Sequence, residues 1–259
     1  GSNQGLSGQA IMSKIWFFGD SYVTRIHESQ SEIKSWTLSV HEAFPEHDSE
    51  NLALSASSID YLYFAYEQKR KHFSDQDIVI MSLTTIHRLF LRRHDETSSP
   101  IFLQHNRMHK RGPMEVIDED HPWYNYFLLD LFNPEAHKAK VNLFLNSLQY
   151  DAMRKGIKII VLPINYFDYL DLDDKDSITI GKTTEKTSLM TVTEKQYDAK
   201  LNIKLRGNDH WYNHQEGIEY DRTLANHLTP RNNEILANKV IRNIKTNEPI
   251  DLTTEWEYT

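Results

Sequence analysis

A serine near the start of the chain and a histidine near its end are of the right types to carry out covalent chemistry together. Ser21 follows the apolar run from Ile15 to Phe18 in KIWFFGDSYV, directly after the turn-forming pair Gly19 and Asp20. His227 precedes the last predicted helix, in ANHLTPRNNEILANKVI. A serine hydroxyl becomes an effective nucleophile when a histidine accepts its proton. The pair therefore predicts acyl transfer, although Gly-Asp-Ser alone is also typical of a turn or helix cap.

The elements that must position these residues alternate between strands and helices. Apolar runs predict strands over residues 15–18, 50–54, 77–83 and 157–163, and helical spacing predicts helices over 23–44, 57–73, 134–155 and 229–244. Alternation of this kind indicates an α/β fold with a parallel sheet covered on both faces. Any site is then expected at the carboxyl ends of the strands, where Ser21 lies.

The helix boundaries carry their own signals. Ser57 or Ser58 is expected to cap the second helix, and Gly156 to end the third. Thr229 and Pro230 mark the start of the last helix. The predicted apolar faces are Ile26, Ile33, Leu38 and Val40 in the first helix, Ile59, Leu62, Tyr63 and Tyr66 in the second, Val141, Phe144, Leu145, Leu148 and Met153 in the third, and Leu236, Val240 and Ile244 in the last.

The chain is predicted to form one domain. We expect a flexible N-terminus or tag remnant over residues 1–12, a single α/β domain over 13–247, and a C-terminal tail over 248–259. Two poorly patterned segments, at about 84–121 and 165–226, are predicted insertions. Such segments commonly decide specificity.

Composition narrows the classes of function. A net charge of −8 disfavours nucleic acid as a partner, and the absence of cysteine excludes disulfides and thiolate chemistry. No apolar run approaches the roughly 20 residues of a membrane span, and no signal peptide is visible. The prediction is a soluble protein, cytoplasmic by default, with a small-molecule or glycan substrate.

Three segments resemble conserved blocks of the SGNH or GDSL hydrolase family. FFGDSYV is similar to its first block, NLALSASSID to its second, and NHLTPRNNEILANKVI to its closing segment, in the family's order over residues 14–245. The resemblance implies a three-layer α/β/α sandwich with a central parallel sheet of the flavodoxin-like type. It also implies a carboxylic ester hydrolase, with carbohydrate O-acetyl esters among the expected substrates.

The resemblance assigns roles residue by residue. Ser21 matches the nucleophile and His227 the base, and the N–H groups of Ser21 and Ala56 match the oxyanion hole, with alanine where the family has glycine. The family's asparagine donor is missing from LTTIHR, so Thr84, Thr85 or His87 must replace it; Thr85 is our choice.

The orienting acid is also displaced from its usual position. Three residues before the histidine stands Leu224, so Asp221 is the predicted acid, with Asp209 as an alternative. A dyad oriented by Asn226 or a backbone carbonyl is a further alternative.

Three residues beside the proposed nucleophile are predicted to contact substrate: Asp20, His87 and Arg88. No cofactor and no metal are predicted, because the pairs His105/His109 and His210/His214 lack the form of a zinc motif. The acidic run 171–182 likewise lacks the glycine and glutamate of a calcium loop.

Other functions stay open at this stage. The same residues could transfer an acyl group to a sugar hydroxyl, or the chain could be a weakly active or inactive binding domain. A flavodoxin-like phosphate-binding module is disfavoured because the first turn lacks a glycine-rich loop.

Overall fold

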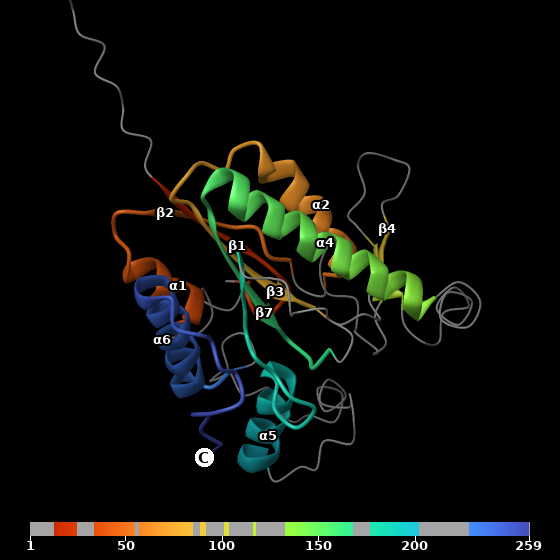
Figure 1. The fold of residues 1–259 in the computed structure, drawn as a ribbon. Helices are drawn as coiled ribbons and strands as arrows, with labels where there is room; N and C mark the ends of the chain where they lie inside the picture. The colour runs from red at the N-terminus through yellow and green to blue at the C-terminus, as the bar shows by residue number, and fades with distance from the viewer. Residues whose placement is uncertain are drawn as a thin grey trace, which may run out of the picture.

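The apolar runs predicted over 15–18, 77–83 and 157–163 form strands of a parallel sheet in the computed structural model (Figure 1). The strand predicted over 50–54 lies earlier, at Asp48–Asn51. The structure describes residues 13–24, 34–54, 57–84, 89–91, 101–103, 116–117, 133–167, 177–201 and 228–258. The sheet has the order β2-β1-β3-β7-β8, and its paired strands are all parallel. Its strands are β1 (Lys14–Phe18), β2 (Asp48–Asn51), β3 (Ile78–Leu83), β7 (Lys158–Pro163) and β8 (Thr179–Ile180).

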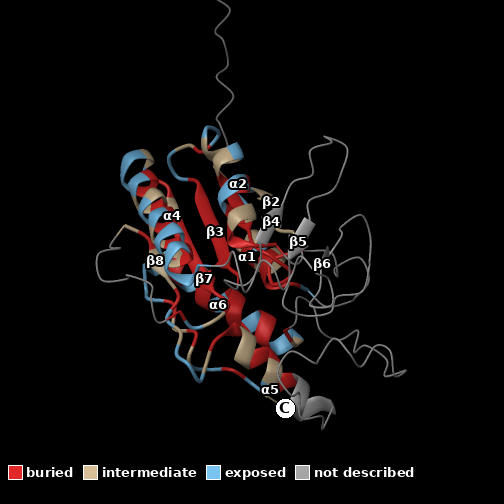
Figure 2. Cartoon of the chain, turned by 90° about the vertical axis from the view of Figure 1, so that its right-hand side faces the viewer, coloured by how far each residue is buried: buried red, intermediate tan, exposed pale blue. Residues whose placement is uncertain are grey.

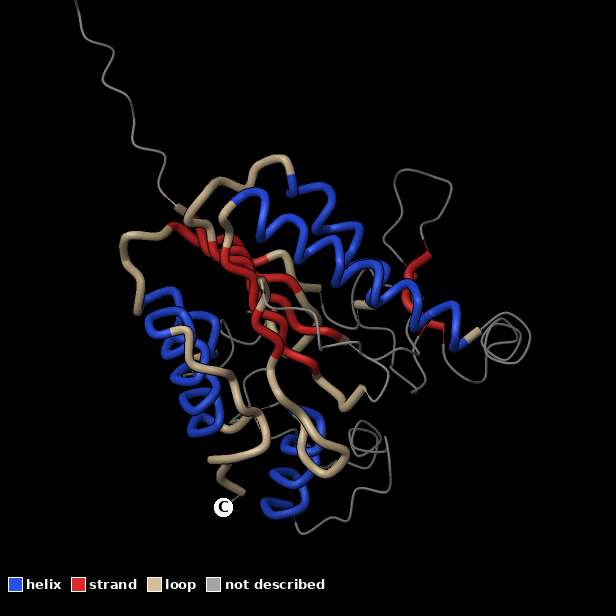
Figure 3. Tube along the Cα trace, viewed as in Figure 1, coloured by secondary structure: helices blue, strands red, loops and turns tan. Residues whose placement is uncertain are grey.

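Helices cover both faces of this sheet, so the predicted three-layer α/β/α architecture is confirmed (Figures 1 and 3). One face carries α1 (Trp36–Glu42), α6 (Pro230–Thr246) and α5 (Leu189–Leu201), and the other carries α2 (Ile59–Arg70) and α4 (Pro134–Lys155). The strand order explains this division. The chain moves from β1 outward to β2, then back across β1 to β3, and right-handed crossovers in opposite directions place their helices on opposite faces.

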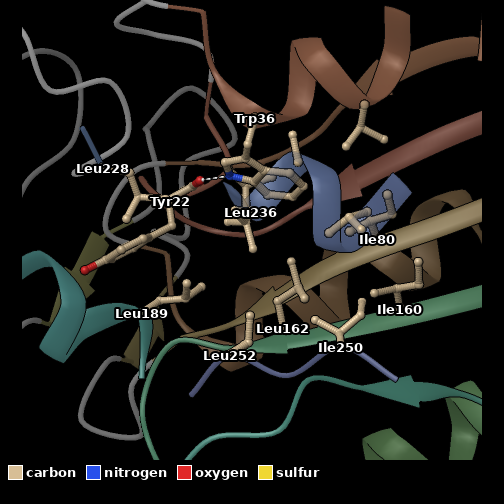
Figure 4. Packing of buried hydrophobic residues seen from close by; sticks show 14 of the residues in the cluster. Tyr22, Trp36, Ile80, Ile160, Leu162, Leu189, Leu228, Leu236, Ile250 and Leu252 are labelled. Atoms are coloured by element: carbon tan, nitrogen blue, oxygen red, sulfur yellow. Dashed lines mark hydrogen bonds between the residues drawn. The ribbon is translucent and has the colours of Figure 1, made fainter. Parts of the chain in front are cut away.

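Side chains of the central strands alternate between two apolar clusters. Ile15 and Phe17 of β1 pack with α1 and α6, whereas Trp16 and Phe18 pack with α2 and α4. All six residues of β3 are buried, as the sequence predicts for a strand covered on both faces (Figure 2). Figure 4 shows the first cluster, in which residues from β3, β7, α6 and the C-terminal segment converge.

Helix caps follow the sequence signals closely. Ser58 caps α2 by accepting a hydrogen bond from the Tyr61 N–H, and Thr229 caps α6. Gly156 ends α4 with a φ of 69°, a left-handed conformation that glycine adopts without steric cost.

Three helix predictions need correction. Tyr63, expected on the apolar face of α2, is 48% exposed. The helix expected over 23–44 is only Trp36–Glu42, preceded by a turn at residues 21–23; Ile26 and Ile33 lie outside the described residues. Met153, expected on the buried face of α4, is 71% exposed, and Ala152 is buried instead. A step of one residue moves a side chain by about 100° around the helix axis, which is enough to exchange an exposed position for a buried one.

The segments predicted as insertions contain regular structure. Residues 84–121 include a small second sheet of β4 (Leu89–Leu91), β5 (Ile101–Leu103) and β6 (Val116–Ile117), with β4 and β5 antiparallel. Residues 165–226 include β8 and α5, so this stretch supplies the last strand of the main sheet. A strand of two residues carries too little apolar pattern to be recognised in a sequence.

The segment predicted as a C-terminal tail packs into the fold. Ile250, Leu252 and Trp256 are buried in the same cluster as α6. A parallel bridge between Lys182 and Asp251 ties the segment to the chain after β8. These three residues are therefore part of the core.

None of the helices in the described ranges combines the length and apolarity needed to cross a bilayer.

A buried charged cluster joins the two helices of the second face. Asp151 of α4 is 1% exposed and accepts hydrogen bonds from Tyr66 and Arg70 of α2, with an Oδ2 to Tyr66 Oη distance of 2.7 Å. Burial alone would raise the pKa of Asp151, but these hydrogen bonds outweigh it and hold that pKa below the ordinary value of 3.8.

We predict that Asp151→Asn destabilises the protein by about 2 kcal/mol at neutral pH, because Arg70 loses the buried one of its two carboxylate partners. The lowered pKa of Asp151 contributes stability above its ordinary pKa, and this contribution disappears as pH falls through the folded-state value. The stability difference between wild type and variant should therefore shrink below about pH 4. Urea unfolding at several pH values measures this. Exposed Asp75→Asn is the matched control, and an equal effect there would contradict the prediction.

Candidate active site

Ser21 lies at the point where the order of the sheet reverses. The chain leaves β1 for β2 on one side and returns to β3 on the other, so the carboxyl ends of β1 and β3 border the topological switch point. Ligands of open parallel sheets bind at such points. Ser21, two residues beyond Gly19, is 7% exposed.

Asp20 organises the turn that carries Ser21. Its carbonyl oxygen accepts hydrogen bonds from the N–H groups of Val23 at 2.9 Å and Thr24 at 3.0 Å. Its carboxylate Oδ1 accepts another from the Tyr22 N–H at 3.1 Å. Aspartate favours this geometry because its short side chain reaches a backbone N–H two residues ahead.

A side chain directly after β3 contacts the other oxygen of the same aspartate. The Thr84 hydroxyl donates to Asp20 Oδ2 at 3.1 Å, and both residues are fully buried. Both carboxylate oxygens of Asp20 thus accept hydrogen bonds from the protein. The contacts give Asp20 a positioning role in the turn; its predicted contact with substrate stays a prediction.

Gly19 provides the space for the turn to fold back over the sheet. A Cβ atom there would lie 2.4 Å from Val23 Cγ2 and 3.1 Å from Ser82 Cβ, closer than non-bonded carbons approach. Glycine is required here because the neighbouring side chains leave no room for a Cβ atom. Ser82, on β3, also contributes by its small size.

The segment flanking Ala56 is tied to the end of β1. The Gly19 carbonyl accepts hydrogen bonds from the Leu54 N–H and the Ser57 hydroxyl, each at 2.9 Å. Ser57 therefore holds the first and second sequence blocks together while Ser58 caps the helix. Ala56 itself lies outside the described residues, but both its flanks reach the carbonyl two residues before Ser21.

Two further donors hold the carbonyls that follow Ser21. Trp36 Nε1 donates to the Tyr22 carbonyl at 2.8 Å, and Asn51 Nδ2 donates to the Val23 carbonyl at 2.8 Å. Neither residue was singled out from the sequence. Asn51 opens NLALSASSID, the segment that resembles the second block, whereas an isolated tryptophan has no periodicity or motif that would identify it as a contact of the Ser21 turn.

Most of the other predicted site residues lie outside the described residues: Thr85, His87, Arg88, Asp209, Asp221, Asn226 and His227. Their predicted roles stay predictions. Leu228, bonded to His227, is described and is fully buried. Figure 4 shows it in the same apolar cluster as Tyr22, the residue after Ser21.

Among the described residues, no group of three or more histidine, aspartate and glutamate side chains could hold a metal ion.

A cavity of about 740 Å³ lies at the opposite, amino edge of the sheet. Its charged lining is internally paired: Lys69 Nζ lies 2.7 Å from Glu50, and Lys14 Nζ lies 3.5 Å from Asp48. Asp77 accepts hydrogen bonds there from the Lys14 N–H and Trp16 Nε1. The charges are used within the protein, and the cavity is separate from Ser21.

Comparison with known proteins adds little. No protein family and no curated protein matches the chain. Among solved structures, the crystal structure of protein YxiM from Bacillus subtilis is similar at 12% identity and a TM-score of 0.31, over 59% of this chain and 33% of that one. The chain thus spans about a third of the length of YxiM, and a likeness this weak carries no argument about function.

We predict that Thr84→Val destabilises the protein by about 1.5–3 kcal/mol, because a buried carboxylate oxygen of Asp20 loses its hydroxyl donor. Urea unfolding measures the loss. Thr246→Val, which removes a hydroxyl at the exposed end of α6, is the control and should change stability by less than about 0.5 kcal/mol. Equal effects in the two variants would contradict a special role for the Thr84 to Asp20 contact.

Gly19→Ala tests the close packing of the turn. The added methyl group must displace Val23, and overpacking of this kind costs about 1–3 kcal/mol. Gly5→Ala in the N-terminal stretch is the control. Thermal unfolding distinguishes the two, and an unchanged midpoint in Gly19→Ala would show that the turn relaxes freely.

Proposed function

We propose that this protein is a serine-dependent carboxylic ester hydrolase in which Ser21 is the nucleophile. One observation carries the proposal: Ser21 sits on a tight turn directly after β1, at the switch point of a parallel sheet. The turn is anchored by Asp20 and Thr84, so the serine is presented by a rigid support. Preorganised supports are what catalytic groups require.

His227 is the proposed base. Its side chain takes the proton of the Ser21 hydroxyl as Oγ attacks the ester carbonyl carbon, forming a tetrahedral intermediate. The intermediate then expels the alcohol, which receives that proton from His227. Water attacks the resulting acyl-enzyme, with His227 again as base, and releases the carboxylic acid and free Ser21. Asp221 is the proposed partner that orients the imidazole.

Stabilisation of the negative oxygen is assigned to the N–H groups of Ser21 and Ala56, with Thr85 as a third donor. The anchoring of Leu54 and Ser57 to the Gly19 carbonyl supports this, because it keeps the chain on both sides of Ala56 beside the end of β1. Loss of one oxyanion donor typically costs about 100-fold or more in turnover.

The proposed substrate is a small acyl ester, with an O-acetyl group on a carbohydrate as the favoured class. His87 and Arg88 follow β3 in the sequence, so they are the proposed contacts to the alcohol part of the substrate. If a sugar hydroxyl replaced water in the second step, the same residues would catalyse acyl transfer.

We predict that wild-type protein hydrolyses p-nitrophenyl acetate and is labelled by a fluorophosphonate at Ser21. Ser21→Ala should abolish the label and reduce turnover by at least about 1,000-fold, and His227→Ala should reduce turnover by a similar factor. Ser74→Ala is the matched control, because its half-buried hydroxyl donates to Asp77 Oδ1 at the opposite, amino edge of the sheet. That variant should keep both activity and label.

Different results lead to different conclusions. Activity that survives in Ser21→Ala would assign hydrolysis to another residue and overturn the proposal. A folded wild-type protein with no label and no turnover would favour a binding domain instead.

A further inference from the structure

A chain of buried hydrogen bonds links the two segments that carry the proposed serine and histidine. Trp36 Nε1 donates to the Tyr22 carbonyl at 2.8 Å (Figure 4), and the Trp36 N–H donates to Asn233 Oδ1 at 3.0 Å. Asn233 Nδ2 then donates to the Leu228 carbonyl at 2.9 Å. Tyr22 follows Ser21 directly, and Leu228 follows His227.

These linking groups are buried, which makes the connection specific. Trp36 and Asn233 are each 1% exposed, and Leu228 is fully buried. The Asn233 amide uses both ends, since its oxygen accepts from Trp36 while its nitrogen donates to Leu228. A buried amide left without a partner is costly, so this arrangement admits little variation in geometry.

A second connection runs through α5. The Tyr22 hydroxyl donates to Thr193 Oγ1 at 3.0 Å, and one turn later Gln196 Oε1 accepts the Thr229 N–H at 2.9 Å. Gln196 is 2% exposed, and its oxygen also accepts from the Asn232 amide at 2.7 Å. The side chain of Tyr22 and the chain entering α6 are thus held by the same helix.

We infer that Trp36 and Asn233 are positioning residues that fix the Ser21 turn against the chain entering α6. Because His227 is bonded to Leu228, the residue next to the proposed base is held by the same link as the proposed nucleophile. Neither residue needs to touch substrate. The inference rests on the proposed function for its effect on catalysis, while the mechanical link rests on the hydrogen bonds alone.

Two single variants and their combination test the link. Trp36→Phe removes the Nε1 donor but keeps an aromatic ring against Phe17, and Asn233→Leu removes both amide contacts. Each should lower kcat for p-nitrophenyl acetate about 10-fold with KM changed by less than about twofold, because misplacement of reacting groups affects the chemical step.

The double variant supplies the decisive comparison. The two bonds lie in series, so breaking either interrupts the link, and the kcat of the double variant should equal that of the worse single variant. Fully additive losses would overturn the inference, since they would indicate two independent sites. Loss confined to KM would also overturn it.

The chain offers a matched control for each substitution. Trp256 Nε1 donates to the Leu252 carbonyl at 2.8 Å in the same apolar cluster, and Asn243 of α6 donates to the Glu248 carbonyl at 2.7 Å. Trp256→Phe and Asn243→Leu therefore remove the same kinds of bond without touching the link. They should leave kcat within about twofold of wild type; a 10-fold loss in either would show that the effect is general destabilisation and would overturn the inference.

Amide hydrogen exchange separates this inference from the proposed function. In Trp36→Phe, amide exchange should accelerate at least fivefold at both ends of the link. One end is the pair of amides of Val23 and Thr24, and the other is the amide of Asn233, which donates to the Thr229 carbonyl. Trp256→Phe should leave these amides unchanged. If the wild type proves inactive, the proposed hydrolysis fails but acceleration at both ends still supports the link. Acceleration at one end only would overturn it.

Discussion

Five consecutive carbonyl groups follow β1 in a buried turn, and the rest of the site depends on pairing them. A buried carbonyl without a hydrogen-bond donor costs roughly 1–3 kcal/mol, so a turn that folds back into the core needs donors from its surroundings. Here each carbonyl has at least one donor. The donors are Leu54 and Ser57 for Gly19, Val23 and Thr24 for Asp20, the Thr24 hydroxyl for Ser21, Trp36 for Tyr22, and Asn51 for Val23.

These donors come from separate parts of the chain, so the turn is bonded to several elements of the fold. Trp36 opens α1, Asn51 ends β2, and Ser57 precedes α2. Thr84, at the end of β3, adds the hydroxyl that meets Asp20. The turn is thus connected to the three strands nearest the switch point and to both crossovers between them. Its position is determined by the whole first half of the sheet.

The sequence predicted the parts of this architecture that depend on local pattern. Consecutive branched residues identified β3, and the pairing of Pro230 with a threonine cap located the start of α6. It could not predict the contacts of Trp36 or Asn233, because their partners lie far along the chain and a single polar contact leaves no repeat. The β8 strand could not be predicted for a related reason, since two residues are too few to show the alternation of a strand.

The contacts of Asp20 within the fold could not be predicted for the same reason. An aspartate beside a candidate nucleophile has the chemistry to contact a ligand, and the sequence contains no sign that Thr84 and the Tyr22 N–H occupy its two oxygens. Only the fold brings β1 and β3 together. Polar contacts of this kind add modest net stability, yet the cost of leaving any of them unpaired is large. Their principal effect is therefore to exclude alternative geometries, which is the property that the proposed nucleophile and base require of the segments that hold them.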